Sequence, residues 1–249
     1  MSGEVCLTVD VEDWYDGMEV LGEPFPKPAG AMSGLTGLAD LLAQSPLSPR
    51  VTLFVVGNYA ESVSGELAEL VERGHEVASH GPDHGRLPED PKGLVDWLRT
   101  GRSMMEDIVQ APVGGFRSPR FDIPDSIGLA RYRDLVAEAG FEYVSDTREL
   151  GAGCPVRELP VLSMHGFPMG GGSYQRLLPA SVVTGAVGSA DGPTVLYYHS
   201  YDFGATLPGP GSIRSLAVAK QLVGRARVAR VFSKILSRYG SKACTNVEW

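Results

Sequence analysis

The sequence is poor in cysteine, in positive charge and in long hydrophobic runs, and each shortage excludes a class of protein. Its three cysteines, Cys6, Cys154 and Cys244, are odd in number and far apart, so no disulfide framework is expected. Acidic residues outnumber basic ones by 30 to 22, and the net charge of −8 argues against nucleic acid or an anionic membrane as a partner. No apolar segment is long enough to span a bilayer.

The first residues, MSGEVCLTVDVEDWYD, lack the basic start and apolar run of a targeting signal. We therefore expect a cytoplasmic protein from a reducing compartment, with an oligomeric state that the sequence leaves open. Its basic C-terminal stretch, residues 213–240, has the spacing of one long amphipathic helix whose charges form a solvated face.

Short apolar runs alternate with helical patterns along the chain, with no linker or repeat between them. This alternation predicts a single α/β domain over residues 1–249, built on a parallel sheet that is open or closed into a barrel. The predicted strands lie within 5–11, 51–57, 75–80, 113–121, 140–146, 156–162 and 194–203, and the predicted helices within 34–44, 59–74, 91–110, 134–139 and 213–240. The glycine-rich segment 164–174 reads as a loop.

Polar side chains follow most of these strands at the point where each one ends. Because active sites of parallel α/β folds gather at the carboxyl ends of strands, these residues are expected to converge. They are Asp10, Glu12, Asp13, His80, His84, Arg117, Arg120, Asp146, His199, Tyr201 and Asp202. Each alone has an ordinary structural use, such as a helix cap for the aspartates or a hydrogen-bonded turn for SHGPDH. Their shared position favours a site.

The chemistry of such a set is that of metal-assisted hydrolysis. Two neutral imidazoles and a carboxylate provide three ligands and leave positions open for water and substrate. A further carboxylate can act as a base and a further histidine as an acid, with an arginine that keeps the base ionised and oriented.

The segments TVDVEDW, TLFVVG, GHEVASHGPDH, GFRSPRF and LYYHSYDF, in this order, resemble the polysaccharide deacetylases of carbohydrate esterase family 4 over nearly the whole chain. The opening D-x-E-D form and the segment GGGSYQRLLP, with Tyr174 and Arg176, are most similar to the subgroup found with bacterial exopolysaccharide loci.

The resemblance implies a deformed (β/α) barrel with about seven parallel strands and a divalent metal, most often Zn²⁺. It also implies hydrolytic removal of N-acetyl groups from an acetamido sugar or a sugar-bearing metabolite. By matching position, Asp10 is the general base, His199 the general acid and Arg117 the partner of Asp10, while His80 and His84 bind the metal. A backbone N–H near VEDWY would help the metal to hold the oxyanion.

The third metal ligand remains open. The commoner family motif has two adjacent aspartates, the second of which binds the metal, but Val11 occupies that position here. Strand alternation directs Glu12 to the side of Asp10, whereas Asp13 reaches the site if the chain has already turned. We favour Asp13 for its shorter side chain and keep Glu12 beside it. If neither carboxylate reaches the two histidines, a metal-independent hydrolase of cyclic ureides or imides becomes the better hypothesis.

Substrate contacts are expected from residues close to these motifs, namely Trp14, Arg120, Asp146, Tyr174 and Tyr201. Trp14 could alternatively fill the core. A third hypothesis is a glycan-binding module without catalysis, which the joint presence of base, acid and ligand candidates argues against.

Overall fold

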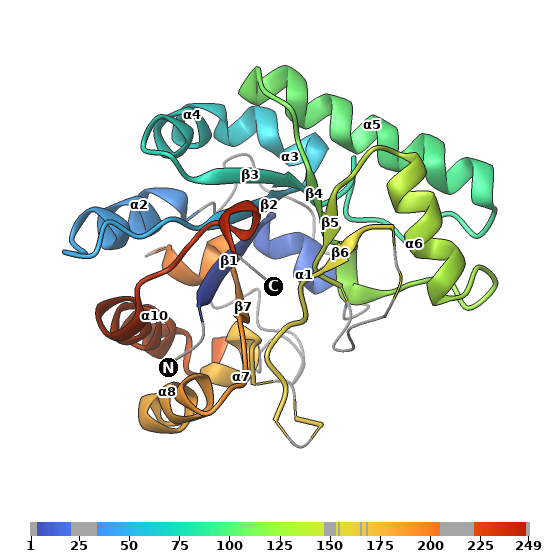
Figure 1. Cartoon of the computed structure of the whole chain (residues 1–249). Helices are drawn as coiled ribbons and strands as arrows, with labels where there is room; N and C mark the ends of the chain where they lie inside the picture. The colour runs from blue at the N-terminus through green and yellow to red at the C-terminus, as the bar shows by residue number, and fades with distance from the viewer. Residues whose placement is uncertain are drawn as a thin grey trace.

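The computed structural model describes residues 4–20, 34–146, 153, 155–164, 166–167, 169–204 and 222–247. In these residues seven strands form one sheet in the order β6-β5-β4-β3-β2-β1-β7, and every strand pair is parallel. The sheet curls into an incomplete barrel with helices packed around it (Figure 1). The predicted deformed (β/α) barrel is confirmed.

The strands are β1 (Val5–Val11), β2 (Thr52–Val55), β3 (Glu76–Ser79), β4 (Gly115–Phe116), β5 (Tyr143–Val144), β6 (Arg157–Glu158) and β7 (Thr194–His199). The α-helices are α1 (Trp14–Val20), α2 (Leu35–Ala43), α3 (Gly57–Ala60), α4 (Ser64–Glu72), α5 (Pro91–Val109), α6 (Leu129–Glu138), α7 (Gly172–Gln175), α8 (Ala180–Gly188) and α10 (Arg225–Tyr239). Short 3-10 helices are η1 (Glu61–Val63), η2 (Pro119–Phe121), η3 (Ser200–Phe203) and η5 (Cys244–Asn246).

Strand β1 lies between β2 and β7, and all of its residues are buried. Its odd-numbered residues belong to the main apolar cluster, which includes residues of the surrounding helices, while Cys6 belongs to a second cluster that Phe54, Tyr143 and Val195 share. Because side chains alternate along a strand, Thr8 and Asp10 lie on the same side as Cys6. Polar side chains are thereby directed to the inner side of the curled sheet.

Several predicted elements differ in the structure. The strands predicted over 113–121 and 194–203 end at Phe116 and His199, and the 3-10 helices η2 and η3 follow them. The glycine-rich segment 164–174, expected to be a loop, runs into α7 at Gly172, and α8 follows. The helix predicted over 213–240 is not continuous: α10 begins at Arg225, directly after Gly224, whose φ of +73° is left-handed. Residues 205–221 lie outside the described part.

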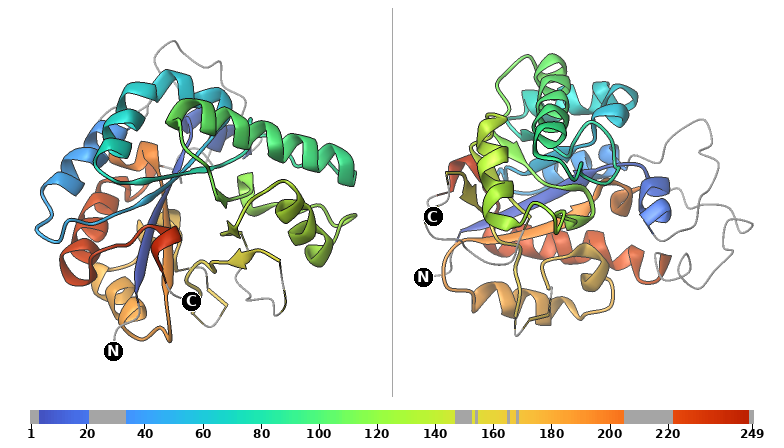
Figure 2. Two further views of the ribbon diagram at one scale, coloured as in Figure 1. Left: turned by 45° about the horizontal axis from the view of Figure 1, so that its top comes forward. Right: turned by 90° about the vertical axis from the view of Figure 1, so that its right-hand side faces the viewer.

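The carboxyl end of β1 leads directly into α1, and this end of the barrel lies away from the two chain termini (Figure 2). Within the described ranges, no helix is both long and apolar enough to cross a membrane.

Candidate active site

The carboxyl ends of β1, β3, β4 and β7 bring together the polar residues expected from the sequence. Asp10 is the register partner of His199 on neighbouring strands, although the two are far apart in the chain. His80 directly follows β3, and Arg117 directly follows β4. All four are buried except for the side chain of His199, which is 17% exposed.

Glu12, His80 and His84 form a cluster with the donor set of a metal site. One ligand atom from each residue lies within 4.8 Å of the others. Glu12 Oε2 is 2.7 Å from His84 Nε2 and 3.7 Å from His80 Nε2. One carboxylate oxygen and two imidazole nitrogens therefore face a common point.

The orientation of each imidazole is fixed by the backbone around it. His80 Nδ1 lies 2.9 Å from the carbonyl oxygen of Arg117, to which it donates, so Nε2 is left as the ligand atom facing Glu12. His84 is returned toward His80 by a turn at Gly81, where φ is +83° and an added Cβ would lie 2.1 Å from the Trp97 ring. Only glycine fits this turn without strain.

The end of β1 selects Glu12 rather than Asp13. The strand continues through Val11, so alternation carries Glu12 to the side of Asp10. Asp13 instead precedes α1, where its Oδ1 accepts the Tyr15 N–H at 3.0 Å. The geometry therefore favours Glu12 over Asp13, which was preferred from the sequence, because the carboxylate of Asp13 caps a helix start.

Glu12 and His84 influence each other's protonation. Burial raises the pKa of the Glu12 carboxyl, but the charge of His84 and hydrogen bonds from both histidines outweigh it and hold this pKa well below its ordinary value. Burial lowers the pKa of His84, while the Glu12 charge and hydrogen bond raise it, with a net increase. A cation at this point would replace the imidazolium proton as the partner of Glu12.

Arg117 holds Asp10 and joins three strands. Its Nη1 is 2.6 Å from Asp10 Oδ1 and 2.9 Å from Thr8 Oγ1, and its Nε and Nη2 bind the carbonyl and hydroxyl oxygens of Ser145 at 3.0 and 2.7 Å. The guanidinium carbon lies 4.1 Å from the centroid of the Phe54 ring. Thr8 and Ser145 were missed by the sequence argument, although strand alternation places Thr8 on the side of Asp10.

His199 lies beside the Glu12 carboxylate, with Nε2 3.9 Å from Glu12 Oε1. Its ring stacks on Tyr201 at 4.9 Å between centroids and 5° between planes. Asp202 Oδ2 accepts the backbone N–H of His199 at 3.2 Å and lies 3.7 Å from His199 Nδ1. Burial lowers the pKa of His199, but Asp202, Glu12 and Asp10 raise it above the ordinary value.

Three of the five residues expected to contact substrate are buried. Trp14 is 1% exposed and packs edge-on against Tyr15, so it fills the core. Tyr201, 2% exposed, supports the ring of His199. Asp146 accepts the Ser118 N–H at 2.5 Å and the Tyr132 hydroxyl, and burial raises its pKa. All three side chains, which were predicted to contact the substrate, therefore make their contacts within the protein.

The other two expected contacts differ in position. Arg120 is half-buried, adopts a left-handed φ of +65°, and donates from Nη2 to the carbonyl oxygen of His84 at 3.3 Å. Tyr174 is 38% exposed and packs edge-on against Phe167 at 5.2 Å. Arg120 thus adjoins the candidate metal residues, whereas no contact recorded in the described ranges links Tyr174 to them.

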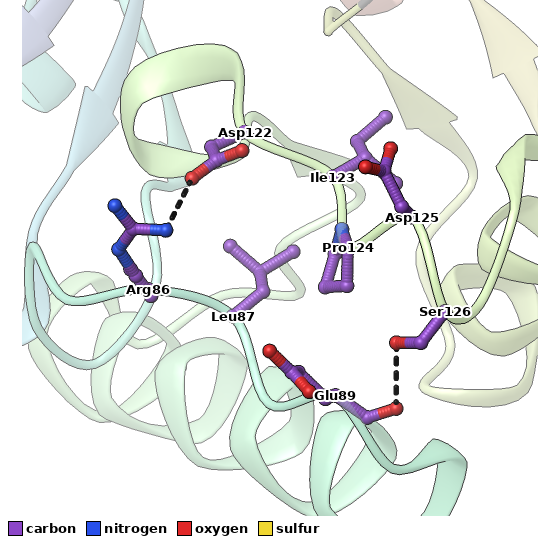
Figure 3. Close-up of a pocket in the computed structure, with 8 residues that line it drawn as sticks. All are labelled: Arg86, Leu87, Glu89, Asp122, Ile123, Pro124, Asp125 and Ser126. Atoms are coloured by element: carbon purple, nitrogen blue, oxygen red, sulfur yellow. Dashed lines mark hydrogen bonds and ion pairs between the residues drawn. The ribbon is translucent and has the colours of Figure 1, made fainter.

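A cavity of about 310 Å³ lies between the loop after His84 and the segment after η2 (Figure 3). Arg86 on one side pairs with Asp122 on the other at 3.7 Å. The carboxylates of Glu89 and Asp125 also line it, which gives the cavity a net negative wall. Its lining begins at Arg86, two residues after His84 in the chain, so the cavity is a neighbour of the candidate site.

Part of the chain is similar to a known protein family. Residues 34–144 match the family model described as polysaccharide deacetylase. This segment contains His80, His84 and Arg117, whereas Asp10, Glu12 and His199 lie outside it. No curated protein sequence matches the chain significantly.

Solved structures share the fold at low sequence identity. A presumed polysaccharide deacetylase from Mycobacterium smegmatis is 19% identical, with a TM-score of 0.64 over 95% of this chain and 85% of that one. PuuE allantoinase is 14% identical, with a TM-score of 0.58 over 94% and 91% of the two chains. A pseudoenzyme of the CE4 family from Bacillus anthracis is 12% identical, with a TM-score of 0.57 over 99% of this chain and 65% of that one. These structures share the barrel fold of this chain, although they are described as a deacetylase, an allantoinase and a pseudoenzyme.

Proposed function

We propose that the whole chain is one polysaccharide deacetylase domain and that it hydrolyses the N-acetyl group of an acetamido sugar or sugar-bearing metabolite. Water adds to the amide carbonyl, the C–N bond breaks, and the products are acetate and a free amine. The observation that carries this proposal is the convergence of Glu12, His80 and His84 beside the Asp10–Arg117 pair and His199.

The residues fit a divalent metal, and we propose Zn²⁺ as the ion. A carboxylate and two imidazoles form the donor set of catalytic zinc sites, and the backbone contact of His80 Nδ1 leaves Nε2 for the ion. When bound, the metal would supply Lewis-acid chemistry, polarising the amide carbonyl and making a water molecule more acidic.

The chain's own groups would move the protons. In this proposal the Asp10 carboxylate takes a proton from the attacking water, while Arg117 at Oδ1 fixes the direction of the carboxylate. His199 donates a proton to the leaving nitrogen, for which its partly exposed ring beside Glu12 is well placed. Arg120, next to His84, is the expected substrate contact that the geometry supports best.

The main alternative is a metal-independent hydrolase of cyclic ureides or imides, which the fold shared with an allantoinase supports. A glycan-binding module without catalysis is the other, and the pseudoenzyme neighbour has the same fold. The Glu12–His80–His84 cluster favours the deacetylase over both, because neither alternative requires two imidazoles and a carboxylate facing one point.

The test is an acetate-release assay with zinc-supplemented protein over N-acetylated monosaccharides, nucleotide sugars and short chitin oligomers, with allantoin as the counter-substrate. We expect acetate from at least one acetamido sugar and no opening of allantoin. The variant H80N/H84N should lose this release by at least about 100-fold, because general acid–base groups alone contribute only part of the rate. Turnover of allantoin without metal would replace the proposal with the first alternative.

A further inference from the structure

Asp202 and Arg176 form a buried ion pair at the carboxyl end of β7. Their side chains are 0% and 1% exposed, and Arg176 Nη2 binds Asp202 Oδ1. Arg176 belongs to the segment GGGSYQRLLP and comes directly after α7, and Asp202 belongs to η3, directly after the strand that carries His199. Two segments separated along the chain thus place a carboxylate beside the ring of His199.

The contacts of Asp202 are directed at His199. Asp202 Oδ2 accepts the backbone N–H of His199 at 3.2 Å, and the same oxygen is 3.7 Å from Nδ1. That Nδ1 is buried, and the backbone N–H and the carboxylate of Asp202 both lie beside it in a capping box at the start of η3. Because buried polar atoms are normally paired, and catalytic hydrogen bonds are often long before substrate binds, Asp202 is the partner toward which Nδ1 can close.

The absence of a side chain at Gly172 lets the backbone of α7 approach Asp202 closely. At Gly172 an added Cβ would lie 3.2 Å from Asp202 Oδ2 and 3.2 Å from the Tyr198 ring. The backbone of α7 therefore packs closely against the pair, and Arg176 reaches Asp202 one turn later. Asp146, the other buried carboxylate considered from the sequence, is held by Ser118 and Tyr132 instead.

We propose that Asp202, held in place by Arg176, is a positioning residue that fixes the His199 imidazole with Nδ1 toward Asp202 and Nε2 toward the substrate amine. This inference rests on the proposed deacetylase function. A carboxylate at Nδ1 limits the ring to one orientation and one tautomer, as an acid that serves a single leaving nitrogen requires. The motif GGGSYQR then contributes to catalysis through the arginine, without touching the substrate.

The kinetic test is a double-mutant cycle of D202N and H199A on acetate release. If Asp202 acts through His199, D202N alone should lower kcat by about 10- to 100-fold with KM changed less than about twofold. In the H199A background the same D202N change should then alter the residual kcat by less than about twofold. An equal loss in both backgrounds would overturn the proposal.

Charge burial requires a second variant, because D202N leaves Arg176 without its carboxylate and could prevent folding. The variant R176Q/D202N removes both charges and should reproduce the kcat loss and its absence in the H199A background. Arg133 and Glu158 form a comparable buried ion pair on α6 and β6, so R133Q/E158Q is the matched control. The control should leave kcat unchanged at a similar fall in melting temperature, and a matching loss of kcat there would contradict a specific role.

A spectroscopic readout separates this inference from the proposed function. Ring-nitrogen NMR spectra of zinc-supplemented protein, at a pH where the imidazole is neutral, should show the Nδ1–H tautomer of His199, with H199A identifying the signal. R176Q/D202N should shift this tautomer toward Nε2–H. If wild type and variant share one tautomer, the positioning role is rejected even when acetate is released. If the tautomer shifts but no acetate is released, only the proposed function fails.

Discussion

At the scale of single residues, neighbouring acids at the end of β1 have different tasks. Glu12 faces His84 at 2.7 Å, while Asp13 accepts the Tyr15 N–H at the start of α1. We expect E12Q to weaken zinc binding by at least about 100-fold, since even partners of metal ligands contribute about 10- to 100-fold. D13N is the matched control and should lose at most about 1 kcal/mol of stability as a weakened cap. Competition with a chromophoric chelator measures both, and equal affinities of E12Q and wild type would contradict the assignment.

His75 provides a pH test away from the site. It is 7% exposed, its Nδ1 accepts the Val51 N–H at 3.2 Å, and burial, with Arg50 and Arg73, lowers its pKa from 6.5 to about 4. Because the folded pKa lies below the unfolded one, its contribution to stability is complete above pH 6.5 and is lost as the pH falls toward 4. The full loss is about 3 kcal/mol or less.

The variant H75N keeps an acceptor for Val51 but cannot titrate. In urea unfolding between pH 7 and pH 4.5, wild type should therefore lose more stability than H75N does. Parallel curves for the two proteins over this interval would show that His75 is not held neutral by the fold.

At the scale of elements, the turn after β3 determines where His84 lies. Gly81 combines a φ of +83° with the Trp97 ring 2.1 Å from any added Cβ. We expect G81A to destabilise the fold by about 2 kcal/mol or more and to impair zinc binding, because strain and overpacking act together. Gly65 in α4 has no neighbour within 4 Å of an added Cβ, so G65A should leave both properties unchanged or raise stability slightly. The melting temperatures of G81A and G65A, measured with and without zinc, test both expectations.

The elements also show what the sequence could predict. The strands were recognisable because β1 and β2 are largely apolar and fully buried. The candidate metal residues Glu12 and His80 come directly after the apolar parts of β1 and β3, so the sheet and the meeting of His80, Arg117 and His199 could be predicted. The break at Gly224 and the helix α7 depend on tertiary contacts, such as the close approach of Gly172 to Asp202. For the segment 164–174, the glycine-rich composition alone indicated a loop.

At the scale of the whole molecule, the candidate metal site exists only when the sheet is formed. Glu12 comes from the end of β1, and both histidines follow β3. In the sheet, β2 lies between β1 and β3. An ion that binds only the folded chain stabilises it, by about 2.7 kcal/mol at a hundredfold excess over the dissociation constant. For a chain of this size, zinc should raise the melting temperature by about 5 to 10 °C. The same addition should leave the melting temperature of H80N/H84N unchanged, and an equal rise there would place the ion elsewhere.

The most direct measurement of the central claim follows acetate release as zinc is returned to metal-free protein. The substrate is whichever acetamido sugar the wild-type protein hydrolyses. If Glu12, His80 and His84 hold the catalytic metal, the rate should be negligible in the metal-free protein, rise in proportion to added zinc and level off at one equivalent per chain. Full activity in the metal-free protein, unaffected by zinc, would contradict the account.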